Sequence, residues 1–574
     1  MHPTRRGLLL GFLVGALVVS DGWGVAGRDP DRAVPPSPPV QAAAELPAAA
    51  REAVAAAQAL GAQAASDQAI DPLIPPDLSV LQPLPAGQFL VGAAVTSIAP
   101  DPSRWQTEGC SELLSNFPEE ITHLAGQLLE GELPLGWPRS PDCIYLGGYG
   151  IGPARAATSV DPHAGVHVRS IAISNGLDTV IWQTVDLVGF FNRYRSDLCD
   201  GCGILDIRRR IAASTGLPVA NIATGSTHTH GGPDGYGAWG GLPRWYREQL
   251  RDRVVASAFD ALRAMRPAAI TIGSAEFPSF SRERRDTYYS AADYGAVWLQ
   301  ARGLQGGEHP GQVIATLVNY AAHPVVLGAQ AQMHGDWPAT ASKALGDQLG
   351  GVGLVVEGGL GNVSPRIPGP DVSDDDYEAV IQMGERFAAA VAAGIARGGH
   401  QLASNVIAAA ETTISHPASN WLEVGLAVGG LLDREFVGGD GAGGPGTYTW
   451  TKNDSQGLLR PCVTASPTTV RTQVSAYRVG ELRVVTGPGE LFSTMTNVVK
   501  SRASTADTTG GGTVMVFAQT QDSLGYIIQS FEVDPLGGVT TNVGVGEYEE
   551  TFMLDRCFGD HVLATQLDLL AELG

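Results

Sequence analysis

Two histidines separated by one residue are the pattern in this chain that most directly suggests chemistry. His228 and His230 lie in the stretch Gly225–Tyr236, directly after the apolar run Val219–Thr224, which predicts a buried strand. Alternate residues of a strand point to the same side, so we expect both imidazoles to leave the strand end in one direction. Two neutral imidazoles can form half of a zinc site. Two hydrogen-bonded or surface histidines are the commoner origin of this pattern, and the pair alone leaves both explanations open.

Three other polar residues stand just beyond apolar runs that predict strands. They are His323, Glu490 and Tyr526. Each fits a structural role when it is taken alone: a satisfied core histidine, a glutamate near a helix N-terminus and a packed tyrosine. A catalytic zinc ion needs three or four nitrogen or oxygen ligands and a position open for water. These residues are therefore the candidates to complete a site with the histidine pair.

The elements that must position these residues alternate between strand and helix patterns. Asn175-Gly176 separates two apolar runs and predicts a hairpin. Two long segments have apolar residues at helical spacing, and the second ends before Gly398-Gly399, which fits a helix C-cap. The predicted strands are 89–98, 166–173, 178–187, 313–320 and 353–356, and the predicted helices are 245–265, 376–397 and 558–573. The fold class expected from this alternation is α/β, a large single domain with mixed sheets flanked by helices.

The N-terminus has the features of an export signal. A basic start that contains Arg5-Arg6 precedes the apolar run Gly7–Val19, and small residues surround Gly27. We interpret residues 1–27 as a signal peptide, with an uncleaved membrane anchor as the alternative. Residues 28–88 are rich in proline and alanine and predict a linker, so the catalytic body is expected at 89–574. We find no other run apolar enough to span a bilayer, which predicts a secreted or periplasmic protein.

Composition and cysteine count limit the classes of function. The chain has 574 residues, is 44% hydrophobic and carries a formal net charge of −22. A polyanion needs a basic binding face, so this charge argues against nucleic acid as a partner. Six cysteines in an exported protein predict disulfides. Their order in the sequence suggests the pairs 110–143, 199–202 and 462–557. The CxxC of the second pair could also belong to a zinc knuckle or a redox dithiol, but the sequence context of neither is present.

Four short motifs occur in the order in which the neutral ceramidases carry them. They are STHTHGGP at 226–233, GNVSP at 361–365, GPGE at 487–490 and GY at 525–526. From about Gln88 to the C-terminus, the chain resembles the catalytic domain of that family. The resemblance implies one Zn²⁺ held by His228, His323, Glu490 and Tyr526, with His230 close enough to assist the reacting carbonyl.

The same resemblance implies three more site residues. Arg282 resembles the arginine that contacts substrate, although it stands in a run of charged residues, Arg-Glu-Arg-Arg. Tyr548 resembles the second active-site tyrosine, and Ser364 is the serine of the second motif. Two features depart from the family. Asn362 and Arg366 replace an aspartate and an asparagine around that serine. Family members also continue into an immunoglobulin-like domain, whereas this chain stops after the predicted helix 558–573.

The expected activity is zinc-dependent hydrolysis of the N-acyl amide of a ceramide-like lipid, with transient contact at a membrane surface. Zinc would activate water and polarise the amide carbonyl, Tyr526 or His230 would stabilise the oxyanion, and His230 is the first candidate to protonate the leaving amine. Ser364 as a covalent nucleophile ranks second because it lies in no G-x-S-x-G elbow. Two other functions stay open: a zinc hydrolase of another amide or ester, and a metal-binding protein without catalysis.

Overall fold

The computed structural model describes residues 72–574 apart from several internal segments. Those segments are 111–141, 151–153, 286–291, 305–308, 328–329, 368–376, 429–431, 439–445, 450–460, 465, 467, 507–512 and 534–547. The predicted signal peptide and residues 28–71 of the predicted linker lie outside the described residues. All statements on structure below concern the described part of the chain.

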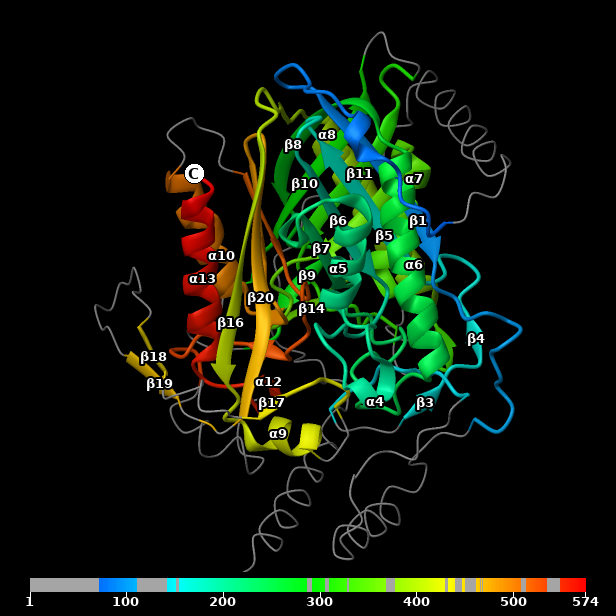
Figure 1. Cartoon of the computed structure of the whole chain (residues 1–574), viewed down its shortest axis with the longest axis vertical. Coiled ribbons are helices and arrows are strands. Elements are labelled where there is room, and N and C mark those ends of the chain that lie inside the picture. Colours follow the sequence, from blue (N-terminus) through cyan, green and yellow to red (C-terminus); the bar gives the residue numbers. More distant parts are fainter. Residues whose placement is uncertain are drawn as a thin grey trace, which may run out of the picture.

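Two β-sheets pack face to face, and helices cover the outer face of each (Figure 1). The first sheet has nine strands in the order β13-β11-β10-β8-β1-β5-β6-β7, with β15 beside β8. The second has five strands in the order β16-β20-β21-β23, with β17 beside β20. Both sheets mix parallel and antiparallel neighbours, so the α/β class with mixed sheets predicted above is confirmed.

The strand bounds follow the runs of β-branched and aromatic residues. In the first sheet they are β1 (Phe89–Ser97), β5 (His167–Ser174), β6 (Thr179–Val185), β7 (Ile222–Ser226), β8 (Arg266–Glu276), β10 (Gly295–Gly303), β11 (Val313–Tyr320), β13 (Val352–Glu357) and β15 (His400–Gln401). In the second they are β16 (Ile407–Pro417), β17 (Val437–Gly438), β20 (Thr468–Val479), β21 (Leu482–Thr486) and β23 (Thr513–Phe517). Side chains such as Trp182, Leu299, Tyr477 and Phe517 fill the space between the two sheets.

Two helical layers bury the outer faces of the sheets. Helices α5 (Ile204–Thr215), α6 (Arg244–Arg263), α7 (Asp336–Leu349) and α8 (Tyr377–Ala396) lie along the first sheet, while α10 (Ser493–Ala506) and α13 (Phe558–Glu572) lie along the second. The predicted apolar stripe of α6 is buried, with Leu250, Val254, Ala258 and Leu262 all in the core. The stripe explains why this segment forms a helix and which face it turns to the sheet.

The predicted hairpin connects β5 to β6. The two strands pair antiparallel, with Ser174 opposite Thr179. The side-chain oxygen of Asn175 accepts hydrogen bonds from the backbone amides of residues 177 and 178. Gly176 has a φ of 86°, and a Cβ there would lie 1.8 Å from the carbonyl oxygen of Gln82. The Asn-Gly pair therefore supplies both the turn and the close approach that this site requires.

The end of the predicted linker belongs to the folded body. The short 3₁₀ helix η2 (Leu78–Val80) and its neighbours pack on the first sheet and α6 through Leu73 and Leu78. The side chain of Asn405 donates hydrogen bonds to the carbonyls of Leu84 and Pro85. The end of the predicted linker therefore contacts the body from Leu73 onward, while the domain boundary at 89 stays a prediction. The apolar residues that make these contacts are scattered among prolines. Because they form no periodic pattern, the sequence did not reveal them.

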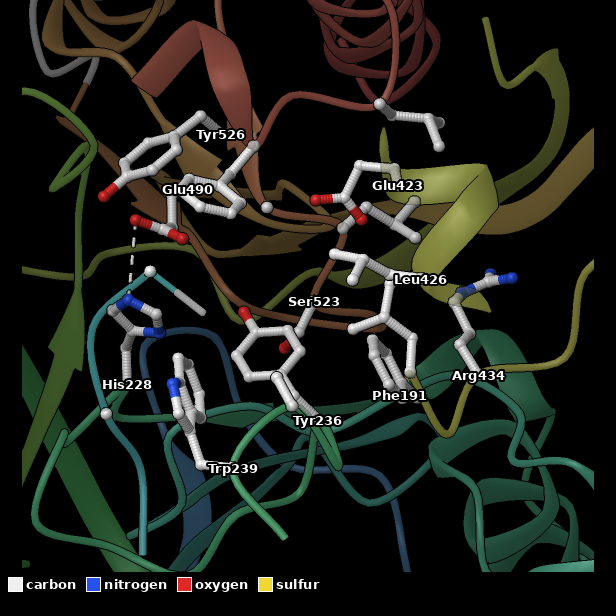
Figure 2. A pocket seen from close by; sticks show the side chains of 18 of the residues that line it. Phe191, His228, Tyr236, Trp239, Glu423, Leu426, Arg434, Glu490, Ser523 and Tyr526 are labelled. Atoms are coloured by element: carbon white, nitrogen blue, oxygen red, sulfur yellow. Dashed lines mark ion pairs between the residues drawn. The ribbon is translucent and has the colours of Figure 1, made fainter. Parts of the chain in front are cut away.

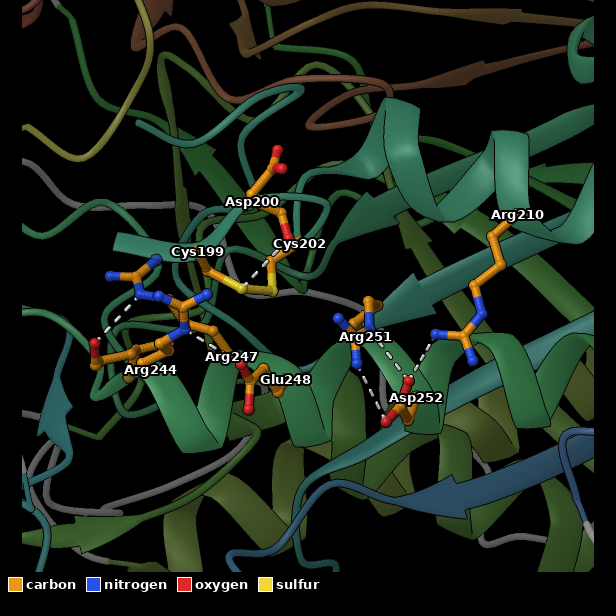
Figure 3. Close-up of a disulfide and its surroundings, with 10 residues drawn as sticks. Cys199, Asp200, Cys202, Arg210, Arg244, Arg247, Glu248, Arg251 and Asp252 are labelled. Atoms are coloured by element: carbon orange, nitrogen blue, oxygen red, sulfur yellow. Dashed lines mark hydrogen bonds and ion pairs between the residues drawn. A yellow bond between two sulfur atoms is a disulfide. The ribbon is translucent and has the colours of Figure 1, made fainter. Parts of the chain in front are cut away.

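The three suggested disulfides are all present. Cys110–Cys143, Cys199–Cys202 and Cys462–Cys557 form, and the described residues contain no free cysteine. Figure 3 shows the second of them between the short helix α4 (Ser196–Cys199) and the start of α5. Nearby, Arg210 of α5 and Asp252 of α6 form an ion pair at 2.8 Å. This CxxC therefore joins neighbouring elements of one helical layer.

Helix α8 is long and apolar enough to cross a membrane by length and composition alone. The prediction that no run beyond the N-terminal one is apolar enough to span a bilayer is wrong by this criterion. The composition reflects burial in the protein core, because Val380, Met383, Phe387 and Val391 are all inaccessible to solvent and pack in a cluster with α7 and the first sheet.

Candidate metal centre

His228 and His230 converge although neither lies on a strand. The strand expected over Val219–Thr224 is a 3₁₀ turn at first, η3 (Val219–Asn221), and β7 then ends at Ser226. His228 has a φ of 63°, which no strand residue adopts. The side-chain alternation of a strand is therefore the wrong reason for the convergence. The turn itself brings the two Nε2 atoms to 3.3 Å from each other.

Each of three buried imidazoles places its Nδ1 atom within hydrogen-bond distance of a backbone carbonyl oxygen. His228 Nδ1 lies 2.6 Å from the oxygen of Val188, and His230 Nδ1 lies 2.7 Å from that of Gly148. His323, just beyond the end of β11, places Nδ1 2.7 Å from the oxygen of Leu360. A nitrogen that faces a carbonyl oxygen must carry the proton, so in the neutral rings every Nε2 atom keeps a free lone pair.

Glu490 adds a carboxylate to these lone pairs. Its Oε2 atom lies 3.1 Å from Nε2 of His323 and 3.4 Å from Nε2 of His228 (Figure 2). Burial acts to raise the pKa of Glu490, but the contacts with His228 and His323 outweigh it and hold the pKa well below its usual range. Burial, followed by the charge of the other imidazoles, lowers the pKa of His230 well below its usual value. The cluster thus combines an ionised carboxylate with a neutral imidazole.

This donor set fits a divalent cation. Possible ligand atoms of His228, His230 and His323 all lie within 4.8 Å of one another, and all three residues are buried. Lone pairs that face each other in the absence of a proton repel, and a metal ion between them removes that repulsion. Imidazole nitrogen with a carboxylate is a typical zinc donor set, and carbonyl acceptors on Nδ1 are its usual outer partners. By their distances, both His230 and Glu490 could act as metal ligands together with His228 and His323.

Two tyrosines complete the floor of the site. The short strands β22 (Glu490–Leu491) and β24 (Tyr526–Ile527) pair parallel, with Glu490 opposite Tyr526. The Tyr526 ring lies 6.3 Å from that of His323, and the Tyr548 ring lies 6.0 Å from that of Tyr526. The Tyr548 hydroxyl accepts a hydrogen bond of 2.8 Å from the amide of Gly150. Burial, together with the charge of Glu490, raises the pKa of Tyr526 well above its usual value, so the phenol keeps its proton.

Arg284, rather than Arg282, is the arginine that reaches this group. Arg282 is exposed on β9 (Ser281–Glu283), where its backbone pairs with Ser364. Arg284 donates to the Tyr526 hydroxyl at 3.4 Å and to the carbonyl of Gly361 at 2.7 Å, and it forms an ion pair with Glu549 at 2.6 Å. The role of Arg282 in contacting substrate stays a prediction, while Arg284 is the member of the charged run that turns inward, because β9 ends at Glu283.

Ser364 and Asn362 lie beside the centre on the loop that includes β14 (Val363–Pro365). Ser364 is half-buried, and among the described residues its hydroxyl has no hydrogen bond to a histidine. Asn362, which stands where the family has an aspartate, donates to Glu283 at 2.7 Å and accepts from the amide of Ser493 at 2.8 Å. An amide can do both, whereas an aspartate would repel Glu283. Asparagine at position 362 therefore suits its two neighbours, Glu283 and Ser493, better than aspartate would.

An apolar pocket opens onto the histidines and the two tyrosines. It encloses about 860 Å³ of space free of atoms, its open mouth included. Apolar side chains form most of its wall, namely Phe191, Leu426, Leu432, Leu524, Phe552 and Leu554. Figure 2 shows His228, Trp239, Glu490 and Tyr526 on one side of the pocket and Glu423, Leu426 and Arg434 on the other. An apolar lining with a few polar anchors is typical of a site for a small apolar ligand.

Comparison with known proteins gives a structural match but no match of sequence. No family model and no curated protein sequence matches the chain. The crystal structure of neutral ceramidase from Pseudomonas aeruginosa superposes over 85% of this chain and 75% of that one, with a TM-score of 0.56 and 15% identity. The chain has the fold of a neutral ceramidase. A structure described as a ceramidase complexed with C2 matches over 84% of this chain and 75% of its own length, with a TM-score of 0.54 and 14% identity.

The neutral ceramidase fold places all four sequence motifs around one centre. His228 and His323 lie just beyond the carboxyl ends of β7 and β11, whereas Glu490 and Tyr526 begin the short strands β22 and β24, which follow β21 and β23 in the chain. The first two strands belong to one sheet and the last two to the other. Residues that are 298 positions apart, at 228 and 526, therefore meet where the two packed sheets end.

Proposed function

We propose that this chain is an exported zinc hydrolase that cleaves the N-acyl amide of ceramide-like sphingolipids to a sphingoid base and a fatty acid. The observation that carries the proposal is the buried group of three imidazoles and one carboxylate at the inner end of an apolar pocket, within the neutral ceramidase fold. The three disulfides fit an oxidising compartment outside the cytoplasm.

His228, His323, Glu490 and Tyr526 would hold one Zn²⁺, which when bound would activate a water molecule and polarise the amide carbonyl. In this proposal His230 transfers the proton. Its Nδ1–H is held by the carbonyl of Gly148, and its low pKa keeps Nε2 unprotonated at rest. Nε2 takes a proton from the water that attacks the acyl carbon and returns it to the amine nitrogen as the C–N bond breaks. The ring of Tyr149, stacked at 4.7 Å, holds the imidazole in place.

Tyr526 and Arg284 supply the charge stabilisation. The raised pKa of Tyr526 keeps its hydroxyl as a donor to the oxygen that becomes negative at the acyl carbon. Arg284 lies within 3.4 Å of that hydroxyl and adds positive charge beside it. Tyr548 holds Gly150, another residue of the pocket lining, through its hydroxyl. Ser364 as a nucleophile ranks second, because attack by serine needs a base in contact with its hydroxyl.

The apolar wall suits the hydrocarbon part of the substrate. Burial of apolar surface contributes about 25 cal/mol per Å², so each further methylene taken into the pocket should raise kcat/KM until the wall is covered. The test is turnover of N-palmitoyl sphingosine, N-acetyl sphingosine, an N-palmitoyl amino acid and a palmitoyl ester by the purified chain. We expect the first to be the best substrate. Preference for the amino acid or the ester would indicate a related zinc hydrolase, and zinc binding without any turnover would indicate a binding protein.

A further inference from the structure

Helix α9 (Trp421–Val428) brings a single carboxyl group to the apolar wall of the pocket. Glu423 and Leu426, three residues apart on this helix, both line the pocket. In Figure 2 the Glu423 carboxyl points into the cavity, on the side away from His228. Glu490 lines the same pocket, and its negative charge acts on the carboxyl of Glu423.

No group in the described part of the chain satisfies this carboxyl. Among the described residues, Glu423 has no hydrogen bond and no ion pair. The arginine of the lining, Arg434, is committed elsewhere: it pairs with Asp522 at 2.5 Å and donates to the carbonyls of Glu435 and Arg471. Burial, followed by the charge of Glu490, raises the pKa of Glu423 to about 8. Glu423 is half-buried at the pocket wall, so a ligand that fills the pocket would remove its carboxyl from water. A polar group removed from water without a partner is costly, and such groups concentrate where a ligand supplies the partner.

We propose that Glu423 is a specificity-determining residue whose carboxyl forms a hydrogen bond with a hydroxyl group of the substrate close to the scissile amide. The proposal rests on the proposed function, since it concerns the substrate of the same site. A hydroxyl both donates and accepts, so it satisfies the carboxyl in either protonation state. A pure hydrocarbon in this position would seal the carboxyl from water and leave it without a partner. The residue thus favours hydroxylated amides over plain ones.

The hydroxyl can come from two parts of such a lipid: the amine part or the α-carbon of the acyl chain. Three amides of nearly equal chain length separate the sources: N-palmitoyl sphingosine, N-(α-hydroxypalmitoyl)octadecylamine and N-palmitoyl octadecylamine. The first carries hydroxyls on the amine part, the second on the acyl part and the third none. The kcat/KM of each is measured with the wild type, with Glu423→Leu and with Glu423→Ala. Glu435→Gln is the matched control. Glu435 is exposed and follows Arg434 in the chain, so this variant removes a nearby carboxylate.

We expect the wild type and Glu435→Gln to prefer one hydroxylated amide over the plain amide by roughly 10–100-fold in kcat/KM. In Glu423→Leu the ratio of kcat/KM between the hydroxylated and the plain amide should fall close to one. The kcat/KM of the hydroxylated amide should fall, and that of the plain amide should change little. The amide whose advantage disappears identifies the source of the hydroxyl. Zinc content and thermal midpoint report folding, and Glu423→Ala replaces the leucine variant if the latter does not fold.

An unchanged preference in a folded, zinc-loaded Glu423 variant would overturn the assignment while leaving the proposed function intact. A wild type with no preference between the plain and the hydroxylated amides would overturn it as well. Failure of the wild type on all three amides is a different result, since it rejects the proposed function and the assignment with it.

Discussion

At the scale of single residues, the function depends on which nitrogen of each imidazole is free. Val188, Gly148 and Leu360 each accept from an Nδ1 atom, so the Nε2 atoms of His228, His230 and His323 face the centre. The three rings look equivalent as ligands. Their proposed tasks differ, with two rings that bind metal and one that moves a proton.

Alanine variants of the three histidines test this division. His228→Ala and His323→Ala remove two ligands that both contact Glu490, so each should lose zinc and turnover together. His230→Ala should keep about one zinc per chain and lose on the order of 10²–10⁴ in kcat, the usual contribution of a proton-transfer group. Elemental analysis beside kcat on N-palmitoyl sphingosine provides the comparison, with exposed His400→Ala as control. Loss of zinc from His230→Ala would instead identify this residue as a ligand.

Tyr526→Phe separates metal binding from stabilisation of the oxyanion. A phenol is a weak ligand beside two imidazoles and a carboxylate, so the variant should keep most of its zinc. It should lose on the order of 10²–10³ in kcat, equal to about 3–4 kcal/mol, because one oxyanion donor is removed. Tyr320→Phe is the matched control: its hydroxyl donates to the carbonyl of Phe277, away from the centre, so only stability should fall, by about 1 kcal/mol. Equal turnover in Tyr526→Phe and wild type would make Tyr526 a structural residue.

At the scale of elements, a glycine fixes the strand pair that carries Glu490 and Tyr526. Gly525 has a φ of 66°, and its carbonyl accepts the amide hydrogen of Glu490 at 2.8 Å. A Cβ at this position would lie 2.1 Å from the carbonyl oxygen of Phe552. Both the backbone conformation and the close approach thus require glycine.

Gly525→Ala should therefore destabilise the protein by about 2–3 kcal/mol and lower zinc occupancy, because the strand pair must shift. Gly216→Ala is the control for the conformation alone. Gly216 has a φ of 78° at the end of α5, but a Cβ there meets no atom within 4 Å, so the cost should be about 1 kcal/mol. Chemical denaturation measures both values. Similar losses in the two variants would show that the contact with Phe552 does not matter.

Asp555 joins several elements near the last helix and gives stability a dependence on pH. It accepts from Nε2 of His416 at 3.0 Å, from Thr464 at 2.5 Å and from the amide of Cys557 at 2.7 Å. Burial acts to raise the pKa of Asp555, but these contacts, that with His416 first, lower it below its ordinary value of 3.8. A lowered pKa means that the folded state favours the charged form. The contribution to stability is therefore present above about pH 4 and is lost as the pH falls through the folded pKa.

Asp555→Asn should be less stable than wild type by about 1–3 kcal/mol at neutral pH, and the difference should shrink as the pH falls below about 4. Denaturation midpoints of the two proteins at a series of pH values measure this. A constant difference across the series would mean that the ionised form of Asp555 contributes nothing.

Sequence patterns predicted elements better than they predicted the site's inner contacts. The hairpin at Asn175-Gly176 and the apolar stripe of α6 are local features, so they were readable and are confirmed. The positive φ of His228 and the inward turn at Arg284 depend on partners distant in sequence, Val188 and Gly361. Glu423 lies in no motif, and only the packing of α9 over the pocket reveals it.

At the scale of the whole molecule, two packed sheets and two helical layers hold one centre at the ends of four strands. Each sheet contributes two candidate ligands, so the centre forms only when the sheets pack correctly. The acidic surface, with a net charge of −22, favours solubility and repels anionic membranes. Contact with a lipid surface would therefore depend on apolar side chains rather than on charge.

Release of sphingosine from N-palmitoyl sphingosine, followed against zinc content, tests the central claim most directly. Metal-depleted protein should release no sphingosine, and activity should return in proportion to added zinc and saturate at about one equivalent per chain. Palmitate should appear in equal amount, because one amide bond is cleaved per turnover. Undiminished release after complete metal removal, or no release from protein that holds one zinc ion per chain, would contradict the account.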